Sequence, residues 1–430
     1  MNLSEQLESF LTSESMAVVR LVKAEAERLD LPLYIVGGSV RDLLLGRVIK
    51  DLDFTVEGDA ANLAEALLRK YAGRVVFHHR FGTATWTLDE STFKRVNIPL
   101  LGTSESFPFL DLISARSETY SQPGALPAVQ RSTIDDDLRR RDFSINAMAL
   151  RLDGKYYGEL VDPLGGRADL ERGLIRVLHD RSFIDDPTRM LRAVRYAGRY
   201  EFVIEPKTLG LIDDEAKPVL AGLSGERLRH EFDLMFEEKN RAAMLNRLAD
   251  LDLLRPIHPS LQFTSPLLAL PEEAPSELGP LAKPESLSFK QTLGWILWLM
   301  PLPVDDIEEI AQRLDFPALL AAATRAAASL FSDLSSFKGW KPSEWTFHLD
   351  GLPALAVYAV FLVTKNENLR EYLSSWRNIK PTINGNHLRQ RGLEPGPRFA
   401  EILRRLRVAW LDGEVKSSED ENKLLEELIL

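Results

Sequence analysis

The spacing of apolar residues changes along the chain, from mixed elements in the first third to a helical pattern in the rest. Residues 1–30 have the spacing of amphipathic helices, and past residue 165 the pattern turns helical and stays helical. Between them, short apolar runs flanked by turn residues predict strands. The expected strands are residues 34–36, 74–77, 84–88 and 109–113. This pattern predicts an α+β head, a mixed sheet with helices, followed by an all-α remainder.

Prolines mark the clearest boundary in the chain. They crowd residues 256–286 and predict a linker or an irregular excursion there. We therefore expect four parts. These are a head over residues 1–155, a helical neck and body over 156–255, the proline-rich linker over 256–286, and a helical body and tail over 287–430.

Composition excludes several classes of chemistry. The 430 residues include no cysteine, which rules out disulfides, thiolate nucleophiles and cysteine-ligated zinc. The N-terminus is acidic and polar and lacks the features of a signal peptide. The apolar stretches at 295–300 and 352–363 are shorter than the roughly 20 residues that span a bilayer, so we expect core helices there. A soluble, cytoplasmic protein without a membrane partner is expected.

The net charge of −11 hides two basic segments. Residues 139–199 carry 13 basic and 9 acidic residues, and residues 385–410 carry 6 arginines and 2 glutamates, so each has a net charge of +4. Basic stripes on an acidic protein are compatible with contact to a phosphate backbone, because the local potential governs approach. The alternative is that these arginines pair with acids on solvated helices.

A glycine pair follows the first predicted strand. Gly37 and Gly38 mark a sharp turn that leaves room for a ligand, and a short helix over residues 40–45 ends at Gly46. Free N–H groups at such a helix start suit an anion such as a triphosphate. A plain turn is the more common role of a Gly-Gly pair.

Three acids form a candidate metal site. Asp51 and Asp53 lie on a predicted strand, where residues i and i+2 face the same side, roughly 6–7 Å apart. Paired carboxylates suit Mg²⁺ bound together with substrate phosphates. Asp111, in the middle of another predicted strand, is the candidate third carboxylate for phosphoryl transfer. The alternatives are a surface turn for the Asp-x-Asp pair and an ion pair with Arg116 for Asp111.

Two further clusters carry candidate nucleotide-binding groups. Adjacent arginines at 140–141 can hold triphosphate oxygens, and Asp142 can bond to ribose hydroxyls, although such a run is often a solvated cluster. Asp186, followed by a proline, fits a helix N-cap. The arginines 189, 192 and 195 recur every three residues along that helix. A carboxylate and a guanidinium at fixed spacing can read a base edge, and the later arginines would reach phosphates.

These motifs together resemble one family closely. In order and spacing, residues 33–235 are similar to the class II tRNA nucleotidyltransferase and poly(A) polymerase family, which includes the bacterial CCA-adding enzymes. The segment from residue 384 to 415 also resembles a tail element of many members. The matching segments are GGSVRDLLLGRVIKDLDF, DLISARSETYSQPGALPAV, DLRRRDFSINAMA, DPLGGRADLERGLIR, DDPTRMLRAVRYAGRYEF and GERLRHEF.

The resemblance implies a nucleotidyltransferase head followed by an elongated helical neck, body and tail. It implies two-metal transfer from CTP and ATP to the 3′ end of tRNA, with the helical parts binding the RNA. The implied roles are Mg²⁺ binding by Asp51 and Asp53, catalysis with Asp111 as third carboxylate, nucleotide contact by Gly38, Arg41, Arg141 and Asp142, and base selection by Asp186 and Arg189 supported by Arg192 and Arg195.

Full CCA addition is the leading interpretation. The loop at 117–137, which CC-adding members lack in part, is intact here. A-only addition stays open, and polyadenylation is disfavoured because an extended basic tail is absent. A non-catalytic RNA-binding protein on the same fold is the alternative from another class. The chain departs from the family pattern at Asp185, where a glutamate is usual, and at Ser144, where a threonine is usual.

Overall fold

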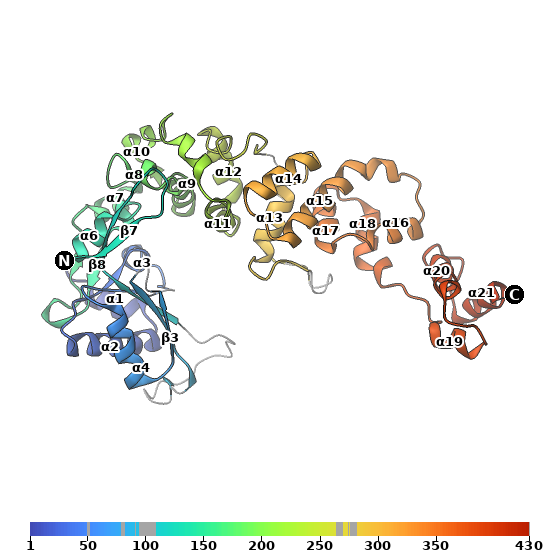
Figure 1. Ribbon diagram of the computed structural model, residues 1–430, viewed down its shortest axis with the longest axis horizontal. Helices are drawn as coiled ribbons and strands as arrows, with labels where there is room; N and C mark the ends of the chain where they lie inside the picture. Colours follow the sequence, from blue (N-terminus) through green and yellow to red (C-terminus); the bar gives the residue numbers. More distant parts are fainter. Residues whose placement is uncertain are drawn as a thin grey trace. The chain divides into compact units, whose positions relative to one another are not determined.

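The chain forms two compact units, Met1–Leu223 and Ser224–Leu430 (Figure 1). The computed structural model describes residues 1–49, 52–78, 82–90, 92–93, 109–263, 270–273, 275 and 282–429. Over these residues, no helix combines the length and the apolar character that crossing a membrane requires. The finer division into four parts stays a prediction.

A seven-stranded sheet is the centre of the first unit. Its strand order is β3-β4-β5-β2-β1-β8-β9, and the only parallel neighbours among these described strands are β2 and β5. All four strands expected from the apolar pattern are present. The strands are β1 (Leu33–Val36), β2 (Asp53–Val56), β3 (Arg74–His78), β4 (Thr83–Thr87), β5 (Phe109–Ser114), β8 (Ala149–Arg151) and β9 (Leu160–Val161).

The two faces of this sheet have different roles. Helix α4 (Ala60–Tyr71) packs on β3, β4 and β5, and α2 (Ser13–Arg28) packs against α4 (Figure 1). The α4 side of the sheet buries Trp86 and Leu112 completely. Because side chains alternate along a strand, Thr85 and Asp111 lie on the opposite face and are only partly buried. The apolar packing therefore directs these polar side chains away from the core.

Short helices and two small sheets complete the first unit. The pairs are β6 (Arg116–Thr119) with β7 (Ala128–Arg131), and β10 (Leu174–Ile175) with β11 (Val203–Ile204). The remaining α-helices described here are α1 (Ser4–Phe10), α3 (Gly38–Leu44), α6 (Ile134–Arg139), α7 (Gly166–Arg172), α8 (Ser182–Asp185), α9 (Thr188–Tyr200) and α10 (Pro206–Gly210).

The second unit is helical throughout its described elements. The predicted core helices at 295–300 and 352–363 correspond to α13 and α17, and the described residues between α12 and α13 form no helix or strand. The helices are α11 (Gly225–Phe236), α12 (Arg241–Asp250), α13 (Phe289–Leu299), α14 (Val304–Arg313), α15 (Ala318–Asp333), α16 (Pro342–Leu349), α17 (Ala354–Thr364), α18 (Glu367–Ser374), α19 (Gly385–Gln390), α20 (Pro397–Leu411) and α21 (Ser418–Ile429).

Aromatic packing holds the first helices of this unit together. Trp295 lies 5.1 Å from Phe236 and 5.5 Å from Trp298, measured between ring centroids. The last three helices, α19 to α21, share a separate apolar cluster that includes Leu388, Leu406 and Leu425.

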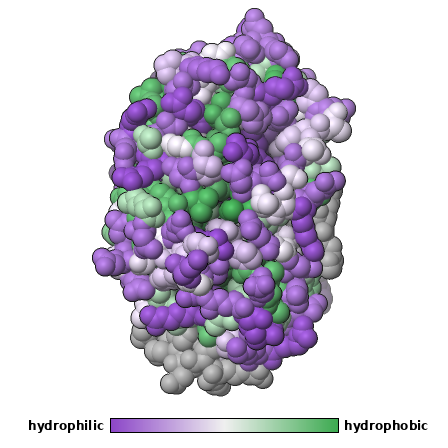
Figure 2. Space-filling view, turned by 90° about the vertical axis from the view of Figure 1, so that its left-hand side faces the viewer, coloured by the Kyte–Doolittle hydropathy of each residue, from purple (hydrophilic) through white to green (hydrophobic). Residues whose placement is uncertain are grey.

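Figure 2 shows that hydrophilic residues cover most of one face of the molecule, with hydrophobic residues in small patches among them.

Candidate active site

Two of the predicted metal ligands lie side by side. Asp53 and Asp111 are register partners in the parallel pair β2–β5, so their side chains leave the same face of neighbouring strands. Strand β2 begins at Asp53, and Asp51 lies outside the described residues. Within the described part of the chain, no cluster of three or more His, Asp or Glu side chains could hold a metal ion. The Asp53–Asp111 pair is therefore the described part of the predicted metal site.

A threonine that the sequence did not single out orients Asp111. Thr85 is the register partner of Asp111 on β4, and its Oγ1 donates a hydrogen bond of 2.7 Å to Asp111 Oδ1. The alternative partner considered for Asp111, Arg116, instead forms an ion pair with Glu118 at 3.2 Å. This contact could not be predicted without the strand register, because 26 residues separate Thr85 from Asp111 in the sequence.

An arginine from a distant motif lies against the glycine turn. Gly37 has a φ of +66°, and a Cβ there would lie 2.6 Å from Arg141 Nη1. A glycine is needed for both reasons, since an L residue disfavours this backbone and a side chain would displace the guanidinium. Helix α3 begins at Gly38, two residues before the expected start. The fold thus brings the glycine turn and the arginine pair together.

A cavity of about 420 Å³ lies beside Asp53. Arg41 is almost completely buried in its wall, and the Arg41 and Arg47 guanidinium carbons lie 4.7 and 4.9 Å from the centre of the Tyr200 ring. Burial raises the pKa of Tyr200 to about 12, so its hydroxyl stays protonated. The lining residues are Gly38, Ser39, Arg41, Asp42, Arg47, Val48, Ile49, Asp53, Arg199 and Tyr200. Three arginines and two carboxylates therefore line the cavity, and such a set of side chains can bind a phosphate chain next to a cation.

One buried acid orients the adjacent arginines. Asp137 is fully buried and accepts hydrogen bonds of 2.8 Å from Arg140 Nη2 and 2.9 Å from Arg141 Nη2. Glu118 accepts a further bond of 2.9 Å from Arg140 Nη1. Burial raises the pKa of Asp137, but Arg141 and Arg140 outweigh it, so the pKa lies below its usual range. Arg140 and Arg141 therefore belong to a buried ionic network and do not form a solvated cluster.

Asp142 connects helix α9 to the glycine turn. It accepts bonds of 2.6 Å from Arg192 Nη2 and 3.0 Å from Asn146 Nδ2, and Asn146 Oδ1 in turn accepts from Arg41 Nη1. Burial raises the pKa of Asp142, but Arg192 and Asn146 outweigh it and lower the value from 3.8 to about 2. The ribose contact predicted for Asp142 stays a prediction.

The lowered pKa of Asp142 predicts that the protein loses stability in acid as this carboxylate becomes protonated. A carboxyl whose folded pKa is depressed stabilises the fold above its unfolded pKa and loses that contribution as pH falls through the folded value. Between pH 4 and pH 2 the loss should be roughly 2 kcal/mol. Urea unfolding at several pH values should show this slope in the unchanged protein and a flatter one in Asp142→Asn. Parallel slopes in the two proteins would contradict the assignment.

The arginines of α9 are held by the fold. Asp186 accepts from the Thr188 backbone N–H at 3.1 Å, and the N-cap of the helix that begins at Thr188 is Pro187, one residue after the expected position. Arg189 is buried and donates to Ser182 Oγ at 2.7 Å and to the Arg140 carbonyl at 2.8 Å. Arg195 is also buried. The base-selecting and phosphate-binding roles of these side chains stay predictions.

The loop at 117–137 reaches the start of α9. The Gly124 backbone N–H donates to the Ile184 carbonyl at 3.1 Å, and the Tyr120 hydroxyl donates to Glu118 at 3.0 Å. A Cβ on Gly124 would lie 3.8 Å from Pro187, next to Asp186. The loop therefore packs against the turn that carries the proposed base-selecting residues.

In the C-terminal basic segment, the alternative interpretation describes three of the six arginines. Arg391, Arg405 and Arg407 form ion pairs with Glu426, Glu414 and Asp350 at 3.1, 2.6 and 2.6 Å. Arg398 donates to the Ile429 carbonyl at 2.9 Å. Arg404 lies over the ring of Phe347, with its guanidinium carbon 4.9 Å from the ring centre. Acidic partners thus neutralise three arginines of this segment, and its contact with a phosphate backbone stays a prediction.

Comparison with known proteins agrees with this geometry. Residues 33–176 match the model of the poly A polymerase head domain, and residues 201–264 match a probable RNA and SrmB-binding site of polymerase A. An A-adding tRNA nucleotidyltransferase of Halalkalibacterium halodurans is 32% identical over 97% of this chain and 94% of that protein. Another, from Geobacter sulfurreducens, is 32% identical over 96% of this chain, which spans 47% of that protein's length.

A solved structure is similar over the whole length. The CCA-adding enzyme of Thermotoga maritima complexed with tRNA has a TM-score of 0.73 and 27% identity, and the match covers 100% of this chain and 98% of that one. The matched head contains the sheet with Asp53 and Asp111, and the identity to the Halalkalibacterium halodurans protein extends over nearly all of both chains. This chain therefore belongs to the tRNA nucleotidyltransferase and poly(A) polymerase family and is a nucleotidyltransferase.

Proposed function

We propose that this chain transfers AMP from ATP to the 3′ end of a tRNA that ends in CC. The observation that carries the proposal is the register of Asp53 and Asp111 beside a cavity lined by three arginines. Terminal A addition is the step that A-adding and CCA-adding relatives have in common. The names of the A-adding relative and of the CCA-adding enzyme both support this activity.

The chain's own residues have distinct tasks in this reaction. The 3′ oxygen of the RNA attacks the α-phosphorus of ATP, a new P–O bond replaces the bond to the β-phosphate, and pyrophosphate leaves. Asp111, which accepts a hydrogen bond from Thr85, would take the proton of the 3′-hydroxyl. Arg141, whose guanidinium lies next to Gly37, and Arg41, whose guanidinium lies next to Gly38, bind the triphosphate.

Divalent metal chemistry fits these residues. Asp51 and Asp53, with Asp111 as the third carboxylate, would hold Mg²⁺, which would neutralise triphosphate charge and make the attacking hydroxyl more acidic. The fit rests on the donor set, since two carboxylates in register on adjacent strands offer hard oxygen ligands on one face. Asp186 and Arg189 would select the base, with Arg192 and Arg195 supporting them from the same helix.

Full CCA addition is the second candidate. The loop at 117–137 favours it over CC-only addition, because the whole loop is present and Gly124 bonds to Ile184. The curated relatives reported above favour A-only addition, since both are A-adding enzymes. CMP transfer is the property that separates the two candidates.

The test uses three tRNA primers that end before C, after one C and after CC. Each is incubated with CTP, ATP or both, and the products are sequenced. AMP transfer to the CC primer is expected. CMP transfer to the shorter primers would assign full CCA addition, and its absence would assign A-only addition. Long A tracts would assign polyadenylation. A chain that binds these RNAs and extends none would be the non-catalytic RNA-binding alternative.

A further inference from the structure

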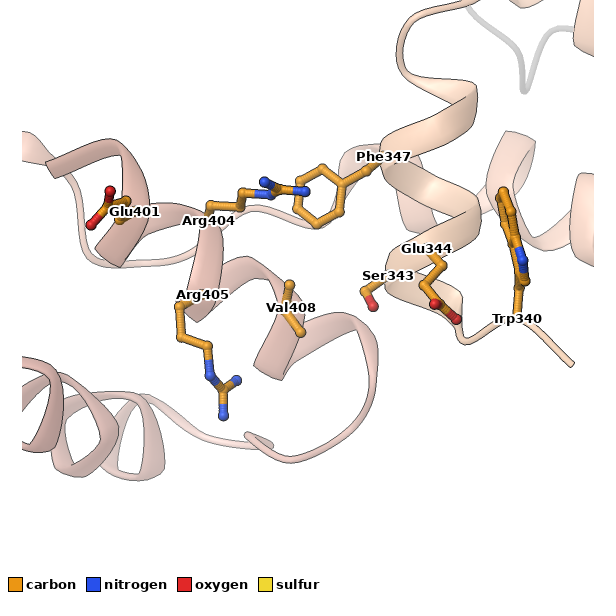
Figure 3. A pocket seen from close by; sticks show the side chains of 8 residues that line it. All are labelled: Trp340, Ser343, Glu344, Phe347, Glu401, Arg404, Arg405 and Val408. Atoms are coloured by element: carbon orange, nitrogen blue, oxygen red, sulfur yellow. The ribbon is translucent and has the colours of Figure 1, made fainter. Parts of the chain in front are cut away.

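A second hollow lies in the helical unit, between α16 and α20, and we call it the α16–α20 hollow. Its volume is about 600 Å³, within the range of ligand sites. Figure 3 shows its side chains, with the Phe347 ring beside the Arg404 guanidinium and Trp340 on the other side of Glu344. The lining residues are Trp340, Ser343, Glu344, Phe347, Glu401, Arg404, Arg405 and Val408.

One face of each helix lines this hollow. On α20 the lining positions 401, 404, 405 and 408 follow the i, i+3, i+4, i+7 pattern of a single helical face. Leu406 points instead into the apolar cluster of the last three helices. Two side-chain contacts connect α16 and α20, and each of them joins one helix to the residue that directly follows the other. Ser343 Oγ donates to Asp412 at 2.9 Å, and Arg407 pairs with Asp350 at 2.6 Å.

The hollow offers flat surfaces that are already ordered. Trp340 packs 4.3 Å from Phe337 and 5.5 Å from His348, measured between ring centroids. Arg404 is stacked over Phe347 with its guanidinium carbon 4.9 Å from the ring centre. Aromatic rings and guanidinium planes of this kind are the surfaces on which unstacked bases of RNA lie.

The charges of the lining favour a base over a phosphate. Two glutamates and two arginines line the hollow, so their charges cancel. Arg405 is already paired with Glu414 at 2.6 Å, and Glu344 accepts the Lys341 backbone N–H at 2.7 Å. A neutral lining with aromatic walls attracts a flat, uncharged group more than an anion. Carboxylates at its edge can accept hydrogen bonds from the amino groups of a base.

We propose that the α16–α20 hollow binds one unstacked nucleobase of the RNA substrate. The proposal rests on the proposed function, which makes RNA the partner of this chain. The base stacks on Trp340 or on the Phe347–Arg404 pair, and a carboxylate such as Glu401 accepts from its amino group. The hollow thus contributes to RNA affinity and takes no part in nucleotidyl transfer.

The test measures equilibrium binding of full-length tRNA ending in CC, by filter binding without nucleotide, at several salt concentrations. The variants are Phe347→Ala, Trp340→Ala and Arg404→Gln. Phe361→Ala is the matched control, because Phe361 is a partly buried aromatic residue of α17 that does not line the hollow. Phe347 is only partly buried and Arg404 is exposed, so these two variants keep the test valid if Trp340→Ala does not fold.

Loss of one stacking surface should raise the Kd about tenfold at every salt concentration. The rate of AMP transfer at saturating RNA should stay unchanged, as should the Kd of Phe361→Ala. Phe347→Ala should also leave the slope of log Kd against log salt unchanged, since no phosphate contact is lost.

Unchanged RNA affinity in Phe347→Ala and Arg404→Gln would overturn the proposal. So would a reduced salt slope in Arg404→Gln with normal affinity in Phe347→Ala, because that result would assign a phosphate contact. The binding arm contains no ATP, so it is independent of catalysis. An unchanged protein that binds RNA but transfers no AMP would contradict the proposed function, and a raised Kd in Phe347→Ala and Arg404→Gln would still support the hollow.

Discussion

Replacement of Asp53 by asparagine is expected to reduce the rate of AMP transfer by at least about 1000-fold. The amide has almost the same shape but no charge, so the site loses one of the anionic ligands that would hold Mg²⁺. Asp53 begins β2 and is only partly buried, so the fold should survive the change. Initial rates with the CC primer and ATP, measured beside tRNA affinity, check this prediction, and the affinity should change little.

The matched control for this variant is Asp30→Asn. Asp30 is exposed and has a φ of +55°, a backbone conformation that asparagine also adopts readily. The control should keep the full transfer rate. Turnover of Asp53→Asn within a few-fold of the control would show that Asp53 is not a metal ligand.

Asp137→Asn should have the largest effect on stability. The fully buried carboxylate accepts hydrogen bonds from both Arg140 and Arg141, and an amide neither carries the charge nor accepts with both of its ends. Breaking a buried ionic network in this way costs about 3–5 kcal/mol. Urea unfolding gives the free energy of unfolding. In protein that remains folded, the KM for ATP should rise, because Arg141 is no longer held against Gly37.

Asp135→Asn on the same helix separates this effect from a general effect of removing an acid. The side chain of Asp135 is 49% exposed and pairs with Arg139 at 2.7 Å, and surface changes of this kind usually alter the free energy of unfolding by less than about 0.5 kcal/mol. Equal stability of Asp137→Asn and Asp135→Asn would show that the arginine pair does not depend on the buried acid.

The sequence alone predicted the local elements well, because they depend on neighbouring residues. The strands at 33–36, 74–78, 83–87 and 109–114 and the helix that follows Gly37 were all expected from short patterns. The chain's membership of its family was also expected, since the motifs match in order and spacing and the family comparisons confirm it. The roles of the individual site residues, including Asp51, stay predictions.

Contacts between distant segments could not be predicted in the same way. Thr85 was missed because only the β4–β5 register places it opposite Asp111. The buried Asp137 reads in the sequence as one of three consecutive acids, and only the packing of α6 shows which of them holds the arginine pair. Similarly, the hydrogen bond that Arg192 donates to Asp142 could not be predicted, and the phosphate contact expected of Arg192 stays a prediction.

The sequence by itself determined which short elements form, where the glycine turn lies and which acids and bases the head contains. Local backbone preference and side-chain chemistry are sufficient for these properties. Only the tertiary structure decided that Asp53 adjoins Asp111, that Arg141 lies against Gly37 and that Arg404 covers Phe347. Strand register and helix packing set these contacts, and both depend on burial of apolar surface by residues far apart in the chain.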